Sequence, residues 1–252
     1  MDKLLIAQKF GKSLSSYNQE AKAQKIIIKR LVSLFEKQNL SSFKRILEFG
    51  TGTGLLTKEI NNRFQYNNLF LNDLSERYIS FVSAQYSAQE LQKISFIEGD
   101  IESIFIPENL DLVISSSTEQ WVENKKIFYN KIYRSLAKEG YFVFSTFGVD
   151  NLKQLREATG KSLKYSNLET NKQELSKYFR IIDAQEDRIS LNFESSLEIL
   201  IHIKKTGVNA LSRENWTRKS VKEIMQKIER VCKNGELLEI TYHPLYFILK
   251  KK

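Results

Sequence analysis

The sequence is poor in cysteine, histidine and proline. Its 252 residues include one cysteine, two histidines and two prolines. A lone Cys232 excludes an internal disulfide framework and a cysteine-based zinc site, so no metal is expected. Pro107 and Pro244 are far apart, and no Pro- or Gly-rich linker or internal repeat divides the chain. A single domain over residues 1–252 is therefore expected.

Long hydrophobic runs are also missing. The longest early run, Leu4 to Ala7, is much shorter than the ~7–15 residues of a signal-peptide core or the ~20 residues of a membrane-spanning helix. We therefore expect a cytoplasmic protein without a membrane partner. The scarcity of cysteine fits a reducing compartment.

Positive charge is in excess and lies toward the two ends of the chain. The net charge is +9. Residues 1–30 carry seven basic and two acidic side chains, and residues 199–252 carry twelve and five. This clustering indicates an acidic partner at the terminal segments, such as nucleic acid, a phosphorylated small molecule or an acidic protein. A solvated lysine-rich surface is the alternative.

Short apolar runs alternate with helical patterns through the first part of the chain. An amphipathic helix is expected over residues 18–38, because its apolar residues recur at helical spacing. Five apolar runs are expected as strands, over residues 45–49, 68–72, 94–98, 110–115 and 141–147. This alternation predicts an α/β fold in which helices cover both faces of a mostly parallel sheet, with ligands at the carboxyl ends of its strands.

The pattern changes after residue 147. A strand is expected over residues 177–190, helices over 194–205 and 217–232, and a terminal strand over 237–249 that is interrupted near Pro244. The two helices would form an insertion before the last strand.

An apolar strand that runs into three glycines is the most informative segment. In residues 45–54, Arg-Ile-Leu-Glu-Phe-Gly-Thr-Gly-Thr-Gly, Glu48 is followed by the loop residues Gly50, Thr51, Gly52 and Gly54. Dinucleotide-binding loops have G-x-G-x-x-G spacing and hold a pyrophosphate, which Glu48 would repel. The same carboxylate suits a ligand that carries an ammonium and a sulfonium, so the segment favours S-adenosylmethionine over NAD.

Two further strand ends carry acids in the expected order. Asp73, followed by Leu74, ends the second strand, where a carboxylate can accept hydrogen bonds from both ribose hydroxyls. The third strand runs into Asp100, Ile101 and Glu102. Asp100 is expected to bond the adenine amino group and the Ile101 backbone a ring nitrogen, although Asp100 alone could be a helix cap.

The fourth strand leads into small hydroxyl residues and an indole. Ser115 ends this strand, and the chain runs on through Ser116, Ser117 and Thr118 to Trp121. The methyl donor should point here, and Trp121 can attract a sulfonium through a cation–π contact of about 0.5–2 kcal/mol. Packing alone is the alternative for this tryptophan.

Several segments along nearly the whole chain match one family. They are Phe10, Tyr17, Ala21 and Gln24, then Leu47–Gly54, Gly99–Glu102, Asp111–Ser116, Gln120-Trp121, Phe144–Gly148 and His202–Ala210. Together they resemble the malonyl-acyl-carrier-protein O-methyltransferases of biotin synthesis. The resemblance implies a class I methyltransferase, Rossmann-like fold with a seven-stranded sheet. It also implies an N-terminal helical cap over 1–40, a cofactor-binding core over 41–150 and a helical lid insertion over 191–235.

The resemblance implies roles for residues beyond the core as well. Phe10 and Tyr17 would close over the cofactor. Phe147, His202 and Lys204 would meet the substrate together with Trp121, and Tyr17, Trp121 and His202 would position the reactants.

Two positions depart from the family pattern. Thr51 replaces a cysteine of the glycine loop, where the backbone carries the contact. Ile201 stands where members commonly have an arginine that suits a malonyl carboxylate. Its absence leaves His202, Lys204 or another cation to meet that charge.

The implied reaction is methyl transfer from S-adenosylmethionine to the free carboxylate of a malonyl thioester on acyl carrier protein or coenzyme A. A carboxylic acid is already ionised at neutral pH, so no general base is required. The acidic acyl carrier protein is the implied partner, which the basic terminal segments could dock. The alternatives are methylation of another small acid or of RNA, although nucleic acid is not the expected partner, and a non-catalytic S-adenosylmethionine-binding protein.

Overall fold

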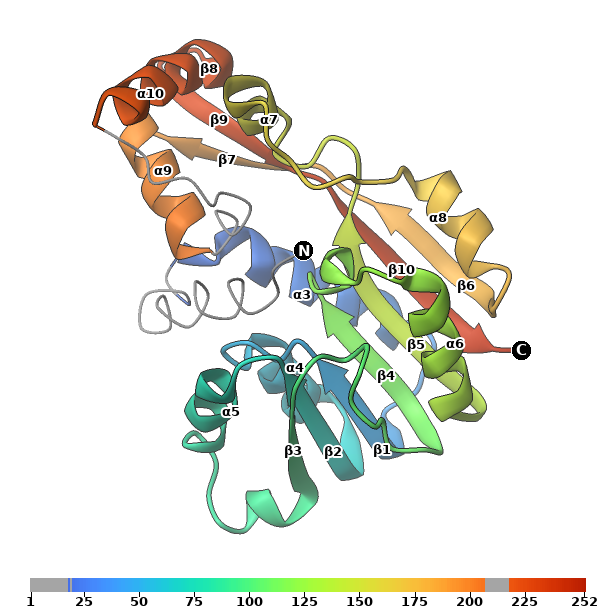
Figure 1. Ribbon diagram of the computed structural model, residues 1–252. Coiled ribbons are helices and arrows are strands. Elements are labelled where there is room, and N and C mark those ends of the chain that lie inside the picture. Colours follow the sequence, from blue (N-terminus) through green and yellow to red (C-terminus); the bar gives the residue numbers. More distant parts are fainter. Residues whose placement is uncertain (1–17, 19, 207–217) are drawn as a thin grey trace.

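A seven-stranded sheet forms the centre of the computed structural model, which describes residue 18, residues 20–206 and residues 218–252. The strand order is β3-β2-β1-β4-β5-β10-β6 (Figure 1). The strands span Ser42–Phe49 (β1), Gln65–Asp73 (β2), Ile94–Glu98 (β3), Leu110–Ser116 (β4), Leu136–Phe147 (β5), Phe179–Glu186 (β6) and Pro244–Lys251 (β10). β1 to β5 run in parallel, and β10 lies antiparallel between β5 and β6. The five early strands and the mostly parallel sheet are therefore confirmed.

The central strands are buried on both faces, which explains their unbroken apolar sequences. In β4, Leu112, Val113 and Ile114 are all fully buried, although successive side chains point to opposite faces. The carboxyl ends of β1 to β4 consequently meet at one edge of the sheet, where polar residues follow each of them.

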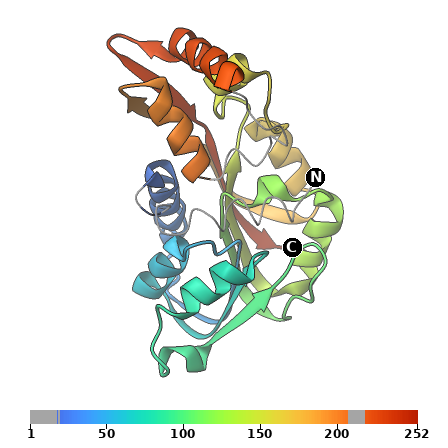
Figure 2. The same cartoon turned by 60° about the vertical axis from the view of Figure 1, so that its left-hand side comes forward.

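Helices cover both faces of the sheet, as the alternating pattern predicts. α3 (Lys22–Glu36), α4 (Leu55–Arg63) and α5 (Glu76–Ser83) contribute to one hydrophobic cluster, and α6 (Lys125–Ser135) and α8 (Leu168–Leu175) contribute to the other. Figure 2 shows α3 in blue on one side of the sheet, between α4 and the orange helix α9 (Ser196–Lys205).

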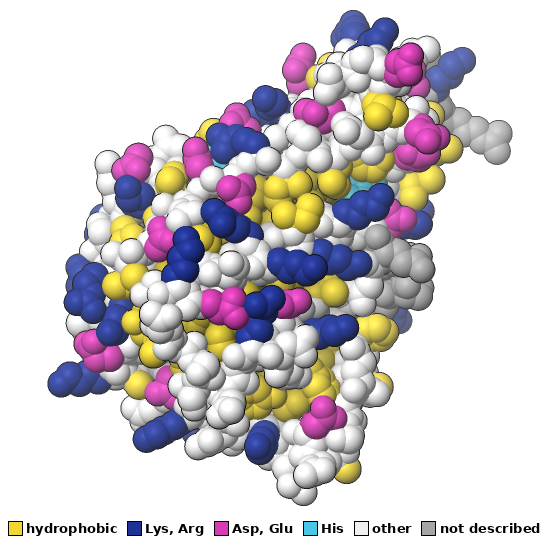
Figure 3. All heavy atoms as spheres, turned by 180° about the vertical axis from the view of Figure 1, so that it is seen from behind, with side chains coloured by type: hydrophobic (Ala, Val, Ile, Leu, Met, Phe, Trp, Pro, Cys, Tyr) yellow, Lys and Arg dark blue, Asp and Glu magenta, His cyan; other side chains and the backbone are white. Residues whose placement is uncertain are grey.

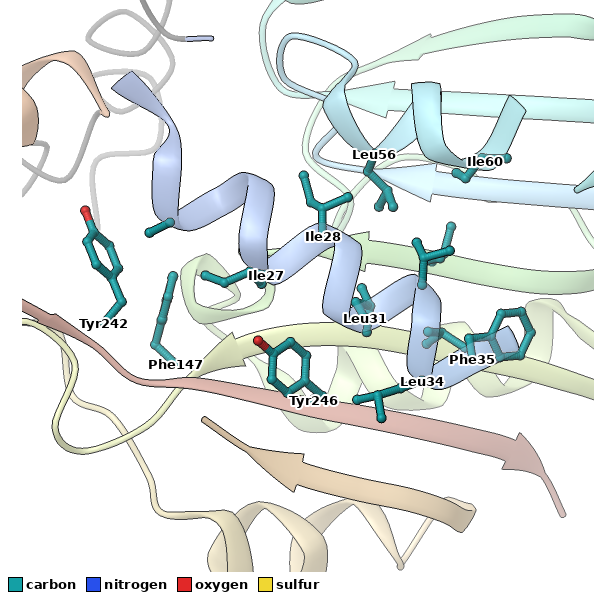
Figure 4. Close-up of a cluster of buried hydrophobic side chains, with 14 of the residues drawn as sticks. Ile27, Ile28, Leu31, Leu34, Phe35, Leu56, Ile60, Phe147, Tyr242 and Tyr246 are labelled. Atoms are coloured by element: carbon teal, nitrogen blue, oxygen red, sulfur yellow. The ribbon is translucent and has the colours of Figure 1, made fainter. Parts of the chain in front are cut away.

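The amphipathic helix expected over residues 18–38 is confirmed by α3. Ile27, Leu31 and Phe35 form its buried face and point toward the sheet (Figure 4). The Phe35 ring lies 5.9 Å from that of Phe43 and 5.4 Å from that of Tyr141, measured between centroids. The opposite face of α3 is left exposed.

The chain after β5 contains more than the helical insertion that the sequence indicates. The strand expected over residues 177–190 is two strands, β6 and β7 (Ile189–Phe193), with a break at Asp187 and Arg188. β7 pairs with β9 (Leu237–Tyr242), and β8 (Lys233–Asn234) completes a second, antiparallel sheet of three strands. This sheet was missed because it joins segments far apart in the chain, which periodicity does not relate.

Three helices accompany the second sheet at the upper end of Figure 1: α7 (Lys153–Thr159), α9 and α10 (Arg218–Cys232). The expected interruption of the terminal strand is confirmed, since β9 ends at Tyr242 and β10 begins at Pro244. Two short 3-10 helices, Glu90–Lys93 and Glu119–Trp121, complete the elements. In the described ranges, no helix combines the length and apolar character needed to cross a membrane.

Candidate active site

A pocket that is partly open to solvent lies where the loops after β1, β2, β3 and β4 meet. Such a position, beyond the carboxyl ends of parallel strands, is where open α/β sheets bind ligands. Ten residues expected from the sequence line it: Glu48, Gly50, Thr51, Gly52, Asp73, Leu74, Asp100, Ile101, Ser116 and Trp121. The structure thus brings together the cofactor residues predicted at four separate strand ends.

The glycine loop leaves open space at its centre. Gly52 has φ +54°, and a Cβ built there would meet nothing within 4 Å. Its N–H donates to Asp73 Oδ2 over 2.8 Å, which ties the loop to the end of β2. The backbone at Gly52 is therefore held in place and faces the pocket without a side chain in between.

We predict that Gly52→Ala weakens cofactor binding at least fivefold, because its methyl group enters the space that a ligand would occupy. Gly160→Ala is a matched control, since Gly160 has φ +70° and also has nothing within 4 Å of an added Cβ, but it ends α7 away from the pocket. Both changes should cost about 1 kcal/mol of stability through left-handed backbone strain. Titration calorimetry and thermal unfolding measure the two effects. Equal cofactor affinity in both variants would contradict this account of the loop.

Glu48 is a fully buried carboxylate at the end of β1. Its Oε2 accepts a hydrogen bond from Thr57 Oγ1 at 2.8 Å, whereas its Oε1 has no partner in the described part of the chain. Burial, and to a smaller extent the nearby charge of Asp73, raises the pKa of Glu48 to about 8. An unpaired buried oxygen of this kind indicates a donor that is supplied by a ligand.

Asp73 accepts hydrogen bonds from two backbone N–H groups beside the pocket. Its Oδ2 accepts from Gly52 N, and its Oδ1 accepts from Ser75 N at 3.0 Å. Burial raises the pKa of Asp73, and the backbone N–H groups offset part of that shift. Each carboxylate oxygen has capacity for a second donor, so the expected ribose contact is compatible with these bonds.

The neighbouring Asn72 was not singled out in the sequence, although it lines the pocket. Its amide donates to the carbonyls of Ile97 and Gly99 at 2.9 Å each, which joins the ends of β2 and β3. The backbone carbonyl of Asn72 accepts from the Thr51 hydroxyl at 3.1 Å. Thr51, which stands in place of the family's cysteine, is therefore bound into the floor of the loop.

The loop after β3 is held by hydrogen bonds from α6, which covers the face of the sheet opposite to α3. Lys131 of α6 donates to the carbonyl of Ile101 at 2.8 Å and to that of Ile104. Glu102 accepts from the backbone of Glu123 and Asn124, at 3.0 and 2.8 Å. Ile101 is thus presented to the pocket, while Glu102 is not part of the pocket lining and holds the next loop instead.

The segment after β4 forms the polar mouth of the pocket. Ser116, Ser117, Thr118 and Trp121 line it. Ser117 has φ +56°, an uncommon backbone conformation for a residue with a side chain, and its buried hydroxyl has no partner among the described residues. Strain and an unpaired hydroxyl at the same residue indicate a functional contact, in a segment that the sequence placed at the reaction mouth without giving Ser117 a role of its own.

Glu119 lies in this segment but does not line the pocket. It is fully buried, and its Oε1 accepts from Tyr129 Oη at 2.5 Å and from Lys125 Nζ at 2.7 Å. The only acidic side chain of residues 116–122 is therefore buried outside the pocket lining, with its Oε1 paired and its Oε2 without a partner among the described residues.

α3 closes the pocket from the side of the N-terminal segment. Gln24 and Ile28 line it, and Gln24 Oε1 is buried without a partner in the described chain. These contacts were not assigned from the sequence, although Ile28 belongs to the apolar stripe of the expected helix and Gln24 is one of the residues that match the family. The remaining lining residues not assigned in advance are Thr53, Leu55, Leu56, Tyr78, Gly99 and Val122.

Several predicted site residues lie elsewhere. Phe10 and Tyr17 fall outside the described residues. Gly54 begins α4 with φ +80°, and the buried Ser115 donates to the Phe49 carbonyl at 2.7 Å. Phe147 is buried, with its ring centroid 6.2 Å from that of Tyr242. None of the four described residues Gly54, Ser115, Glu102 and Phe147 is in the pocket lining.

His202 and Lys204 lie on different faces of α9. His202 is 2% exposed, and its Nε2 lies 2.9 Å from Tyr242 Oη. Burial lowers the pKa of His202, so its imidazole is neutral at neutral pH. Lys204 is exposed, as is Ile201. The structure therefore brings neither His202 nor Lys204 to the described pocket lining.

The charge of the pocket selects among ligands. Among the described residues that line it, three are acids, Glu48, Asp73 and Asp100, and none is Lys, Arg or His. A pyrophosphate would find no cation here, whereas an ammonium, a sulfonium and ribose hydroxyls would find the acceptors that Glu48, Asp73 and Gln24 offer. The residues present thus fit S-adenosylmethionine.

Comparison with known proteins agrees with this geometry. A family model described as "Methyltransferase domain" matches residues 47–144. A Bacteroides thetaiotaomicron protein named malonyl-[acyl-carrier protein] O-methyltransferase is 34% identical over all of this chain and 99% of its own length. A Bacteroides fragilis protein of the same name is 36% identical, and this chain spans about half of it, 51%.

Solved structures show the same fold. The N-methyltransferase NodS from Bradyrhizobium japonicum, determined in complex with S-adenosyl-L-homocysteine, superposes with a TM-score of 0.58 at 13% identity. The match covers 98% of this chain and 98% of NodS.

Proposed function

The chain belongs to the malonyl-[acyl-carrier protein] O-methyltransferase family, and from that premise we propose how its pocket serves the reaction. It is an S-adenosylmethionine-dependent carboxyl O-methyltransferase that converts the free carboxylate of a malonyl thioester into a methyl ester. The thioester is carried by acyl carrier protein, and the methyl ester is the early intermediate of biotin synthesis that the sequence resemblance implies.

The observation that carries the proposal is a reaction mouth in which none of the described lining residues after β4 is a base. Ser116, Ser117, Thr118 and Trp121 surround it, and the carboxylate of Glu119 is engaged elsewhere. Such a mouth is poorly suited to an amine or hydroxyl acceptor, which must lose a proton. It suits a carboxylate, which is ionised at neutral pH and can be methylated through positioning and desolvation alone.

When bound, S-adenosylmethionine supplies an electrophilic methyl group on a sulfonium. The chain's own residues hold the two reactants in register. Glu48 and Asp73 hold the ammonium and ribose, and Asp100 and the Ile101 backbone hold the adenine. Trp121 offers the face of its indole to positive charge, and the unpaired hydroxyl of Ser117 is available to donate to the acceptor carboxylate.

The two residues of α9 that were expected to bind substrate, His202 and Lys204, do not line the described pocket. His202 is neutral and packed against Tyr242, so it acts by positioning α9 and does not supply a cation. Ile201, at the position where the family commonly has arginine, is 39% exposed. We assign capture of the malonyl charge to Lys204 and a substrate contact to Phe147. Phe10 and Tyr17 keep the role that the resemblance implies, closing over the cofactor.

The test is mass spectrometry of malonyl-acyl carrier protein after incubation with this protein and S-adenosylmethionine. We expect the mass of one added methylene group, which is lost again on ester hydrolysis. Acetyl-acyl carrier protein, which lacks the free carboxylate, is the matched control and should stay unchanged. Cofactor binding without any added mass would point to another small acid or RNA as acceptor, or to a binding-only role, and would overturn the proposal.

A further inference from the structure

The exposed face of α3 carries a row of lysines beside the pocket. Lys22, Lys25 and Lys29 are exposed and recur at helical spacing, with the exposed Ile26 between them. We call these four residues the α3 basic face. Figure 3 shows the side of the molecule on which α3 covers the sheet, where Lys and Arg side chains cross the middle of the surface among hydrophobic ones.

The lysines of this face do not stabilise the helix that carries them. α3 has no acidic residue in its first turn, and Lys22 lies there, where the helix dipole disfavours a cation. Lys22 and Lys25 are three residues apart and Lys25 and Lys29 four apart, so their like charges repel. In the described part of the chain, neither Lys25 nor Lys29 has an ion pair with a carboxylate. Among the described residues, the positive charges of Lys25 and Lys29 are thus not neutralised.

Other cations of the same region are already paired, which sets the basic face apart. Arg30 donates to Gln185 Oε1 at 2.9 Å and lies 3.5 Å from Asp187 Oδ2. Lys205 of α9 bonds Glu20 Oε1 at 2.9 Å. The Arg30 contact to Gln185 fastens α3 to β6, and the Lys205–Glu20 pair joins α9 to the residues just before α3. Lys205, and to a smaller extent Lys22, lowers the pKa of Glu20, so Lys22 lies near this pair whereas Lys25 and Lys29 have no such partner among the described residues.

The same helix connects this surface to the reaction site. Gln24 and Ile28, on the buried side of α3, line the pocket. Ile26, which is 48% exposed, supplies an apolar centre among the three lysines. An apolar contact surrounded by charges of one sign is the pattern of an interface with an oppositely charged protein.

We propose that the α3 basic face is the docking surface for the acidic acyl carrier protein that delivers the malonyl thioester. This inference rests on the proposed function. Docking on α3 places the carrier beside the pocket that Gln24 and Ile28 border, so that its prosthetic arm can enter the site. The lysines act on the protein portion of the substrate and leave the chemistry of the carboxylate unchanged.

The experiment compares two thioesters with one charge-reversed variant. The triple variant Lys22→Glu, Lys25→Glu, Lys29→Glu should raise KM for malonyl-acyl carrier protein about tenfold or more. Its kcat/KM for malonyl-pantetheine, which has no carrier protein, and its affinity for S-adenosylmethionine should stay unchanged. For the unaltered protein, KM for the carrier-bound substrate should also rise with salt, and this dependence should weaken in the variant.

The control variant Lys44→Glu, Lys93→Glu, Lys126→Glu makes the same change in net charge at exposed lysines at the amino ends of β1 and β3 and on α6. It should leave both KM values unaltered. Lys→Gln at the three α3 positions gives a milder second variant, and thermal unfolding confirms that each variant is folded.

The outcomes separate the two proposals. If the unaltered protein methylates malonyl-acyl carrier protein, the proposed function stands. If the α3 variants then keep the original KM for the carrier-bound substrate, or lose activity equally on both thioesters, the docking surface is wrong. If the unaltered protein methylates neither thioester, the proposed function fails first.

Discussion

Replacing Asp73 by alanine should weaken S-adenosylmethionine binding by about 1–3 kcal/mol, or roughly 5- to 150-fold in Kd. The change removes the acceptor for the ribose hydroxyls. It also releases Gly52 N and Ser75 N, which Asp73 binds at 2.8 and 3.0 Å. The loop that shapes the cofactor pocket and the charge that holds the cofactor are therefore lost together. Isothermal titration calorimetry measures the affinity.

Asp111→Ala provides the control for the structural part of this effect. Asp111 Oδ2 accepts from the backbone N–H groups of Lys44 and Arg45, at 2.6 and 2.8 Å, at the amino ends of the strands. This variant also frees two backbone donors, but it should leave the cofactor Kd unchanged. Unaltered cofactor affinity in Asp73→Ala would contradict the ribose assignment, and equal losses in both variants would show a general loss of structure.

The second large effect is a pH dependence of cofactor binding that Glu48 controls. Burial raises the pKa of Glu48 to about 8, so the carboxyl is mostly protonated at pH 6 to 7 in the absence of ligand. The ammonium of S-adenosylmethionine should select the ionised form. Kd should then fall by about tenfold per pH unit between pH 6 and 8 and level off above it.

Glu48→Gln should remove this dependence. Glutamine can still accept from Thr57, which donates to Glu48 Oε2 at 2.8 Å, but it cannot ionise. Near pH 7, calorimetry in buffers of different ionisation heat should detect release of close to one proton on binding to the unaltered protein and none with the variant. A flat pH profile in the unaltered protein would refute the role of Glu48.

The pH dependence of the free energy of unfolding provides an independent test of the raised pKa of Glu48. The pKa of Glu48 is about 8 in the folded protein and about 4.5 when unfolded. Its contribution to stability is therefore complete below about pH 4.5 and is lost as pH rises toward 8. The free energy of unfolding should fall by about 1.4 kcal/mol per pH unit within that window. Urea unfolding of Glu48→Gln without ligand should lack this component.

The strand ends of the cofactor site were predictable because each one is a local pattern. An apolar run followed by Gly50, Asp73 or Asp100 can be recognised within about ten residues of sequence. In parallel strands the carboxyl ends meet at one edge, so three local patterns combine into one pocket. Of the residues expected to bind cofactor, Gly54, Glu102 and Ser115 instead form or support the loops around that pocket.

The direction in which side chains point was harder to predict. Sequence spacing does not show that Glu119 turns toward Tyr129 and Lys125, so that no acid stands among the described lining residues after β4. On α9, Ile199 and His202 share the buried face while Ile201 and Lys204 are exposed, as the period of 3.6 residues requires. Proximity in sequence placed His202 and Lys204 together, whereas the helix separates them.

The amino-acid sequence by itself determined that the core strands are parallel, that the cofactor pocket is acidic and that α3 is amphipathic. Each of these properties depends on neighbouring residues and on chain periodicity. Only the tertiary structure decided the second sheet, in which β7 pairs with β9 nearly fifty residues later, as from Leu191 to Ile240. It also decided that α3 lends Gln24 and Ile28 to the pocket while presenting its lysines to solvent. Contacts between distant segments depend on how complete elements pack, and no local pattern contains that information.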